Sequence, residues 1–112
     1  MSTRALAKVY DDSGEKVLVT IYKHWDGYPE GFGAELELIC NGYTLVNGIG
    51  LADSKYIVAN GMPCFAATLI KELKREAGDV YVYPPDTSGM WAEYIYHIKP
   101  DGEQIKVTCE EV

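Results

Sequence analysis

An apolar stripe over residues 61–76 limits the folds open to this chain more than any other feature of the sequence. Its hydrophobic side chains recur every three or four residues, as on one face of an α-helix: Met62, Phe65, Ala66, Leu69, Ile70 and Leu73. Asn60 is a suitable N-cap, Pro63 suits the first turn and Gly78 can end the helix. Such a stripe must cover an apolar surface, so the rest of the chain is expected to supply a sheet.

Strand-like segments lie on both sides of this helix. Residues 4–10 and 16–22 predict an N-terminal β-hairpin, because apolar side chains alternate in the second run and a glycine-containing acidic link separates the two. Residues 79–83, 91–99 and 104–110 predict three further strands, and a Pro-Asp-Gly turn joins the last two. We expect these three strands to form an antiparallel meander.

A second, shorter helix is predicted from near Gly33 to Cys40, with Gly42 closing its last turn in the left-handed conformation. Residues 43–59 mix extended pieces with turn signals and are expected to form a loop with one short strand. The order ββ-α-α-βββ predicts a single α+β domain over residues 1–112. Its mainly antiparallel sheet of about five strands should carry the two helices on one face.

Residues 22–33 join the hairpin to the first helix and read Tyr-Lys-His-Trp-Asp-Gly-Tyr-Pro-Glu-Gly-Phe-Gly, the densest group of functional side chains in the chain. Aromatic rings can stack on a ligand, imidazole and carboxylates can hydrogen-bond to it, and glycines ahead of a helix can offer free N–H groups to an anion. The alternative is a rigid structural loop. The ligand-binding residues expected here are His24, Trp25, Asp26, Tyr28, Glu30, Gly31 and Gly33.

Nine tyrosines are a further notable feature of the composition. Four of them alternate along two strands that are expected to be neighbours, and so are predicted to share one sheet face: Tyr81, Tyr83, Tyr94 and Tyr96. Such a face is either a half-buried pleated surface with wet hydroxyls or a stacking platform for a ligand.

The sequence contains no complete catalytic or metal-binding motif, so no catalytic residue, metal ligand or cofactor is assigned. His24 with Asp26 could serve as an acid–base pair in a small hydrolase or transferase. Cys40 is expected on the apolar face of its helix, where a thiol is inert.

The charge balance, 17 acidic against 10 basic residues, gives a formal net charge of −7 and argues against a nucleic acid polymer as partner. An acidic surface could instead meet a basic protein surface, or only keep the domain soluble. Three widely spaced cysteines without a Cys-x-x-Cys pair favour reduced thiols and a cytoplasmic location. No secretion signal is recognised, and no segment approaches the ~20 apolar residues of a membrane span.

Four segments together resemble a family of small uncharacterised proteins encoded in bacteriophages, prophages and related bacterial genomes: residues 22–31, 45–49, 60–62 and 80–84, which read YKHWDGYPEG, LVNGI, NGM and VYVYP. The resemblance covers most of the chain. It implies a phage accessory protein in the cytoplasm of a bacterial host and brings no activity with it.

Three functions follow from these observations. The leading hypothesis is a non-enzymatic phage-type binding protein, in one version a counter-defence protein, that recognises a small nucleotide-like or polar ligand through residues 24–33. The second is an acidic binder that occludes a basic surface of a host protein complex. The third is a small hydrolase or transferase that uses His24 and Asp26. The expected partner is therefore a small molecule or a host protein, and exposed sheet edges are compatible with a homo-oligomer.

Overall fold

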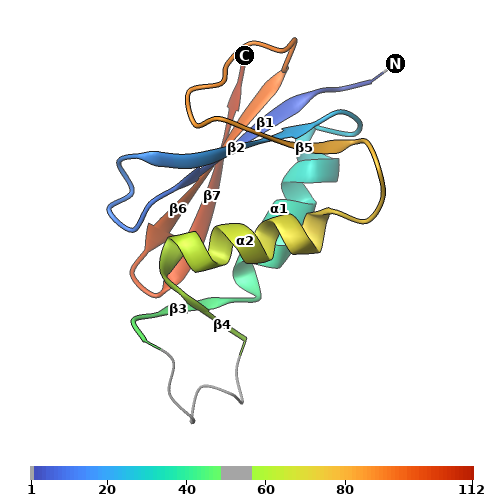
Figure 1. The fold of residues 1–112 in the computed structure, drawn as a ribbon. Coiled ribbons are helices and arrows are strands. Elements are labelled where there is room, and N and C mark those ends of the chain that lie inside the picture. The colour runs from blue at the N-terminus through green and yellow to red at the C-terminus, as the bar shows by residue number, and fades with distance from the viewer. Residues whose placement is uncertain (1, 49–56) are drawn as a thin grey trace.

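The computed structural model describes residues 2–48 and 57–112, which form a five-stranded sheet with two helices on one face (Figure 1). In chain order, the elements are β1 (Ala5–Tyr10), β2 (Val17–Lys23), a π-helical turn η1 (Pro29–Gly33), α1 (Ala34–Asn41), β3 (Thr44–Val46), β4 (Val58–Asn60), α2 (Gly61–Leu73), β5 (Val80–Tyr83), β6 (Tyr94–Asp101) and β7 (Gln104–Glu111). The α+β class, the N-terminal hairpin and the β6–β7 hairpin are confirmed.

The sheet has the strand order β5-β2-β1-β6-β7. All its pairs are antiparallel except β1 with β6, which run parallel. The predicted meander is wrong at one point, because β5 and β6 are separated by two strands. Residues 84–93 instead carry the chain across the face of the sheet opposite to the helices, where the Lys8 ammonium donates to the carbonyl oxygens of Pro85, at 3.0 Å, and Thr87 (Figure 1).

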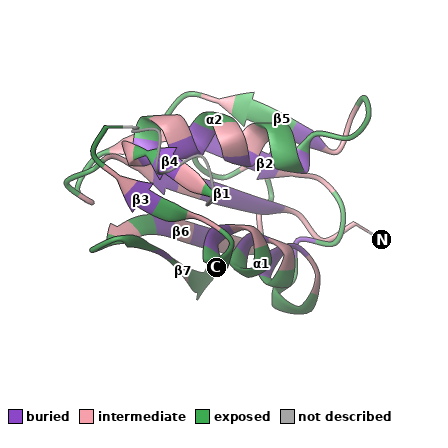
Figure 2. Ribbon diagram, turned by 90° about the horizontal axis from the view of Figure 1, so that it is seen from below, coloured by how far each residue is buried: buried purple, intermediate pink, exposed green. Residues whose placement is uncertain are grey.

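The core lies between the sheet and the helices. From α2, the predicted stripe is buried at Met62, Phe65, Ala66, Leu69 and Leu73. Ala5, Ala7, Val9 and Ile21 face it from β1 and β2, and β1 is buried along most of its length (Figure 2). Small alanine side chains on the central strand let the helical side chains pack closely over it.

The four alternating tyrosines do not share a face, so that prediction is wrong. The strand register places Tyr81 opposite Tyr22, whereas Tyr96 lies opposite Ala7, whose side chain is in the core. Because side chains alternate between faces, Tyr81 and Tyr83 lie on the face crossed by residues 84–93, and Tyr94 and Tyr96 lie on the helix-covered face.

The helix ends differ from the predictions. Asn60 makes no capping bond, and the Met62 N–H donates instead to the Asp12 carboxylate in the β1–β2 turn, at 2.7 Å. The helix ends at Leu73, five residues before Gly78. Gly42, the residue after α1, has a φ of −83° and is therefore in the right-handed region. The predicted left-handed closure of the first helix is wrong. No helix in the described parts of the chain is long and apolar enough to cross a membrane.

Within residues 43–59, the structure has two short strands where one was expected. β3 and β4 form a small parallel pair, and Leu45 donates its N–H to the Glu103 carbonyl oxygen at 2.8 Å. The part of this predicted loop at residues 49–56 lies outside the described residues.

The Asp12 cap gives a test of this fold. Asp12→Ala should lower the free energy of unfolding by about 1 kcal/mol, because the Met62 N–H at the start of α2 loses its acceptor. Asp12→Asn keeps an acceptor oxygen and should recover most of the loss. Urea denaturation at pH 7 measures both, with Glu15→Ala in the same turn as the control; equal stability of the Asp12→Ala and Glu15→Ala proteins would contradict the assignment.

Candidate functional site

Residues 24–33 begin where β2 ends and are fixed against the start of β1. The Gly27 N–H donates to the Thr3 carbonyl oxygen at 2.8 Å, and the Gly27 carbonyl oxygen accepts the buried Tyr96 hydroxyl at 2.7 Å. A Cβ atom on Gly27 would lie 2.7 Å from the Ala5 Cβ atom, which is too close for any side chain. The centre of the candidate site is therefore tightly packed backbone.

The next two glycines are also used internally. Gly31 and Gly33 donate their N–H groups to the Tyr28 carbonyl oxygen, at 3.0 and 3.4 Å. A Cβ atom on Gly31 would lie 2.6 Å from the Asp26 carbonyl oxygen, and one on Gly33 would lie 3.0 Å from the Tyr96 ring. The expectation that these N–H groups are free to bind an anion is wrong, because they form hydrogen bonds within the π-helical turn.

Asp79, just before β5, fixes the first residues of the 24–33 stretch through hydrogen bonds. Its carbonyl oxygen accepts the His24 N–H at 2.8 Å, and its carboxylate accepts the Trp25 N–H at 3.0 Å together with the Lys23 ammonium. Burial raises the pKa of the Asp79 carboxyl, but the hydrogen bonds from Lys23 and Trp25 and the charge of Lys23 outweigh it, so the net pKa lies below its ordinary 3.8.

Five rings form a continuous row on the face crossed by residues 84–93, named here the aromatic row: Trp25, His24, Tyr22, Tyr81 and Tyr83. The Trp25 and His24 rings meet edge to face at 4.9 Å between centroids, and the Tyr22 hydroxyl bonds His24 Nδ1 at 2.8 Å. Tyr22 in turn lies 6.0 Å from the ring of Tyr81 and 6.2 Å from that of Tyr83. The row is accessible at its ends, since Trp25 is 50% exposed and Tyr81 is 45% exposed.

Two cations flank this row. Burial raises the pKa of the Tyr22 hydroxyl, while the charge of Arg4 opposes that rise, so Arg4 lies within electrostatic reach of Tyr22. The Lys74 ammonium lies 5.5 Å from the Tyr81 ring centroid and donates to the carbonyl oxygens of Gly78 and Val80. The row thus combines flat apolar surface with nearby positive charge in an otherwise acidic protein.

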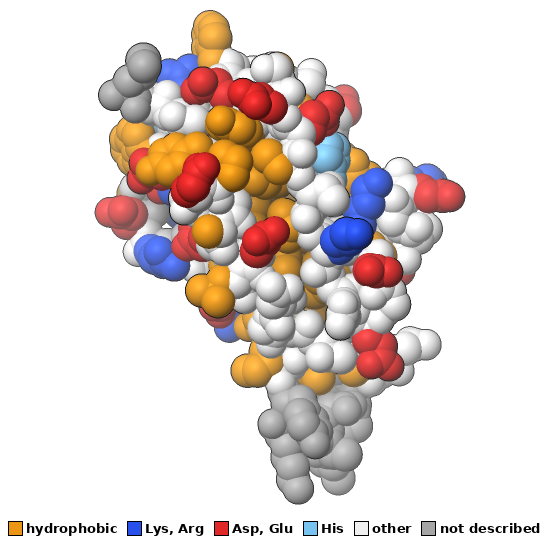
Figure 3. Space-filling view, turned by 180° about the vertical axis from the view of Figure 1, so that it is seen from behind, with side chains coloured by type: hydrophobic (Ala, Val, Ile, Leu, Met, Phe, Trp, Pro, Cys, Tyr) orange, Lys and Arg blue, Asp and Glu red, His pale blue; other side chains and the backbone are white. Residues whose placement is uncertain are grey.

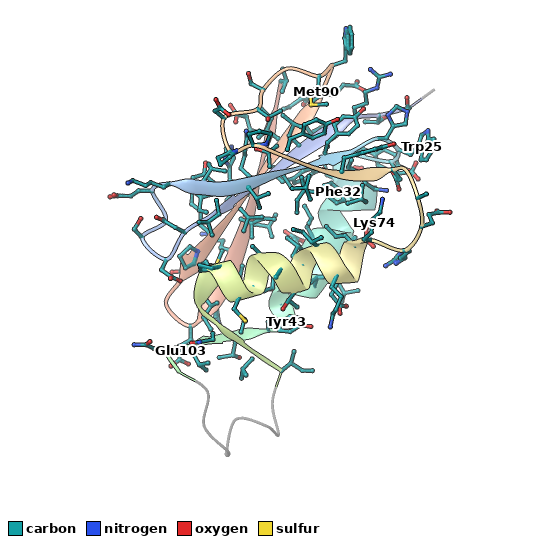
Figure 4. The ribbon with its side chains drawn as sticks, in the orientation of Figure 1. Trp25, Phe32, Tyr43, Lys74, Met90 and Glu103 are labelled. Carbon is teal, nitrogen blue, oxygen red and sulfur yellow. The ribbon has the colours of Figure 1, made fainter. Side chains whose placement is uncertain are left out.

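The other predicted site residues lie apart from the row. The Tyr28 hydroxyl donates to the Asp26 carboxylate at 3.3 Å. Glu30 is exposed in the π-helical turn. The structure therefore brings His24 and Trp25 together in the row, pairs Asp26 with Tyr28, leaves Glu30 exposed outside the row and buries Gly33 against Tyr96. Figure 4 shows Trp25 at the rim of the molecule and Phe32 inside it.

The arrangement does not form the acid–base pair considered for His24. Within the described chain, the hydrogen bond of the His24 ring is with Tyr22, not with Asp26 or Glu30. The Cys40 thiol is no better a nucleophile, since burial and then Glu37 raise its pKa to about 12. Residues 2–48 and 57–112 hold no group of three or more metal-binding side chains that could share an ion.

The row is an open surface. A cavity of about 920 Å³ lies elsewhere, lined by residues of β3, β4 and the β6–β7 turn, and one of about 600 Å³ lies between α1 and α2. Neither is lined by His24, Trp25, Asp26 or Tyr28.

Sequence reasoning missed Arg4, Asp79 and the role of Tyr81 in the row. The alternation of Tyr81 and Tyr83 along a strand was a usable signal, but the face they occupy depends on which strand pairs with β5. Nothing in the sequence indicates that Asp79 receives the backbone of residues 24 and 25 from more than fifty residues away.

Comparisons of the chain with models of known protein families, with curated proteins and with solved structures found no match. The resemblance to phage proteins therefore stays a prediction.

Asp79 should make the stretch sensitive to acid. Because the folded pKa lies below the unfolded one, ionised Asp79 stabilises the fold above about pH 3.8, and this contribution is lost as pH falls through the folded pKa. Asp79→Asn should cost about 1–3 kcal/mol at pH 7 and much less at pH 2.5. Urea denaturation at both pH values measures this, with exposed Asp101→Asn as the control; a cost that is the same at both pH values would contradict the assigned role.

Proposed function

We propose that this chain is a non-enzymatic accessory binding protein of phage type that acts in the cytoplasm of a bacterial host and binds a small nucleotide-like ligand on the aromatic row. The observation that carries the proposal is the continuous contact from half-exposed Trp25 through His24 and Tyr22 to Tyr81. A base is flat and apolar on both faces, so an exposed indole at the end of a fixed row of rings suits it.

Stacking supplies the main attraction in this proposal. A base on an aromatic side chain contributes about 1–3 kcal/mol. The backbone of Trp25 is already held by Asp79, and its ring lies against His24, so ordering the site on binding costs little.

Polar recognition falls to His24 and the flanking cations. The Tyr22 hydroxyl and His24 Nδ1 share a hydrogen bond of 2.8 Å, so Nε2 is the His24 ring atom that is available to bond a polar group of the ligand. The charge of Arg4 acts on Tyr22, and the Lys74 ammonium lies 5.5 Å from the Tyr81 ring centroid. These two positive charges favour one anionic group on the ligand, although the net charge of the protein is −7. The glycine N–H groups cannot contribute, because they are hydrogen-bonded within the fold.

A second copy of the chain would complete this open site. The row reaches β5, an edge strand of only four residues, so a neighbouring subunit at this edge would cover Tyr81 and Trp25 together. Binding without conversion would lower the free concentration of the ligand, which is the effect expected of a protein that counters a nucleotide-based host defence signal.

Isothermal titration calorimetry with cyclic mononucleotides, cyclic dinucleotides and linear nucleoside diphosphates tests the proposal. At least one class should bind with a dissociation constant in the micromolar range or below. Trp25→Ala should weaken that binding about tenfold or more, because it removes the stacking surface. Leu38→Ala, which removes an exposed apolar side chain on α1 away from the row, should leave it unchanged.

The recovered ligand should be chemically unchanged on chromatography after overnight incubation. Absence of binding across the panel, or equal binding by the Trp25→Ala protein, would reject the nucleotide ligand. Conversion of the ligand would reject the non-enzymatic part.

A further inference from the structure

The segment that crosses the sheet ends in a turn with an unusual sequence. In Gly89-Met90-Trp91-Ala92, the Ala92 N–H donates to the Gly89 carbonyl oxygen at 3.0 Å, and the central residues Met90 and Trp91 have φ of 58° and 57°. These left-handed values are those of a type I′ turn, which strongly prefers Asn-Gly because larger side chains strain it. The sequence places two large apolar side chains where the backbone disfavours them.

Trp91 gains no burial in return for this strain. It is 83% exposed, the highest value among the large hydrophobic side chains of the described chain. Its neighbour is Arg4, whose guanidinium lies 5.5 Å from the centre of the Trp91 ring. Strain that the local packing does not repay points to a role outside the chain.

The base of the turn is well anchored. Lys8 holds Pro85 and Thr87 at one end of the crossing segment. At the other end, the Glu93 N–H donates to the Arg4 carbonyl oxygen at 2.8 Å, and the Glu93 carbonyl oxygen accepts the Val112 N–H at 2.9 Å. A side chain held out on a fixed turn loses little freedom on binding, so the turn is preorganised.

The surroundings of Trp91 combine one base, Arg4 beside the ring, with the carboxylate of Glu93. A shallow hollow of about 450 Å³ beside the ring is lined by Ser2, Arg4, Trp91 and Glu93. Glu111 lies opposite Tyr94 in the β6–β7 pair, and the Glu93 carbonyl oxygen accepts the N–H of the residue after Glu111, Val112, so Glu93 and Glu111 belong to the same end of the sheet. Figure 3 shows acidic side chains gathered among hydrophobic ones at the upper end of this face.

We propose that Trp91 is the anchor of a protein-docking surface, and that its partner is a host protein with an apolar slot rimmed by lysine or arginine side chains. The indole fills the slot, as tryptophan does at the centre of many protein interfaces. The carboxylates of Glu93 and Glu111 meet the basic rim, which gives the association its orientation and its salt dependence. This surface goes beyond nucleotide binding and does not depend on it.

The test uses the full chain against a display library of bacterial proteome fragments at 50 mM NaCl. Met90→Asn with Trp91→Gly gives the turn the sequence that its backbone prefers. This double variant should raise the melting temperature by about 5 °C, because the strain is removed. It should also lower the affinity for the selected fragments by about 30-fold or more.

The selected fragments should be enriched in lysine and arginine, and raising the salt to 500 mM should release them. Glu93→Lys with Glu111→Lys should weaken their binding, whereas Glu72→Lys with Glu76→Lys, which changes the net charge equally on and after α2, should not. Trp25→Ala should keep fragment binding and lose nucleotide binding, so failure of one proposal is distinguishable from failure of the other.

Several outcomes would overturn the docking surface. They are no fragment enriched by the wild-type chain, equal enrichment by the double variant, selected fragments without a basic excess, and a lower melting temperature for the double variant. A homodimer that the double variant disrupts in light scattering would assign Trp91 to self-association instead. Co-sedimentation of the wild-type chain with vesicles of phosphatidylcholine and phosphatidylglycerol, lost in the double variant, would assign it to a membrane surface.

Discussion

The buried hydrogen bond from the Tyr96 hydroxyl to the Gly27 carbonyl oxygen ties the most conspicuous stretch of the chain to the middle of the sheet. Burial raises the pKa of Tyr96, so its hydroxyl stays a neutral donor at physiological pH. The bond brings residues 26–33 down onto β1 and β6, and this close approach excludes a side chain at position 27 and leaves little room for one at position 33. Phe32 then lies edge to face on the Tyr96 ring, at 5.6 Å between centroids, and α1 starts from a fixed position.

Because of this hydrogen bond, the backbone and the side chains of residues 24–33 have different roles. The glycines and the N–H groups serve the fold, while His24 and Trp25 are held outside it by Asp79 and Tyr22. Recognition by side chains therefore agrees better with the geometry than anion capture by backbone. The crossing segment, residues 84–93, presents a second exposed tryptophan on the same face from a different support, Lys8. One small sheet thus carries two aromatic surfaces, and Arg4 adjoins both of them.

Local patterns in the sequence were enough for the elements but not for their arrangement. The α2 stripe and the two hairpins were predictable because their periods and turns are local properties. The position of β5 beside β2 was not, since a crossing connection of ten residues leaves no periodic signal, and this one placement sets which tyrosines share a face. For the same reason, the cap that Asp12 gives to α2 and the support that Asp79 gives to Trp25 depend on pairs that only the fold brings together. In the candidate site, His24 and Trp25 could be selected from the sequence. That Asp26, Tyr28 and Glu30 lie outside the aromatic row could not be predicted in this way.

Amide hydrogen exchange, followed by NMR at residues 27–33, tests most directly whether this stretch is internal backbone with external side chains. Slow exchange is expected at Gly27, Gly31 and Phe32, whose N–H groups bond to carbonyl oxygens within the fold. The exchange rates should be the same with and without nucleotide, while the side-chain signals of His24 and Trp25 shift on binding. Fast exchange at the three amides in the free protein, with protection only when nucleotide is added, would instead show that these backbone N–H groups bind the ligand.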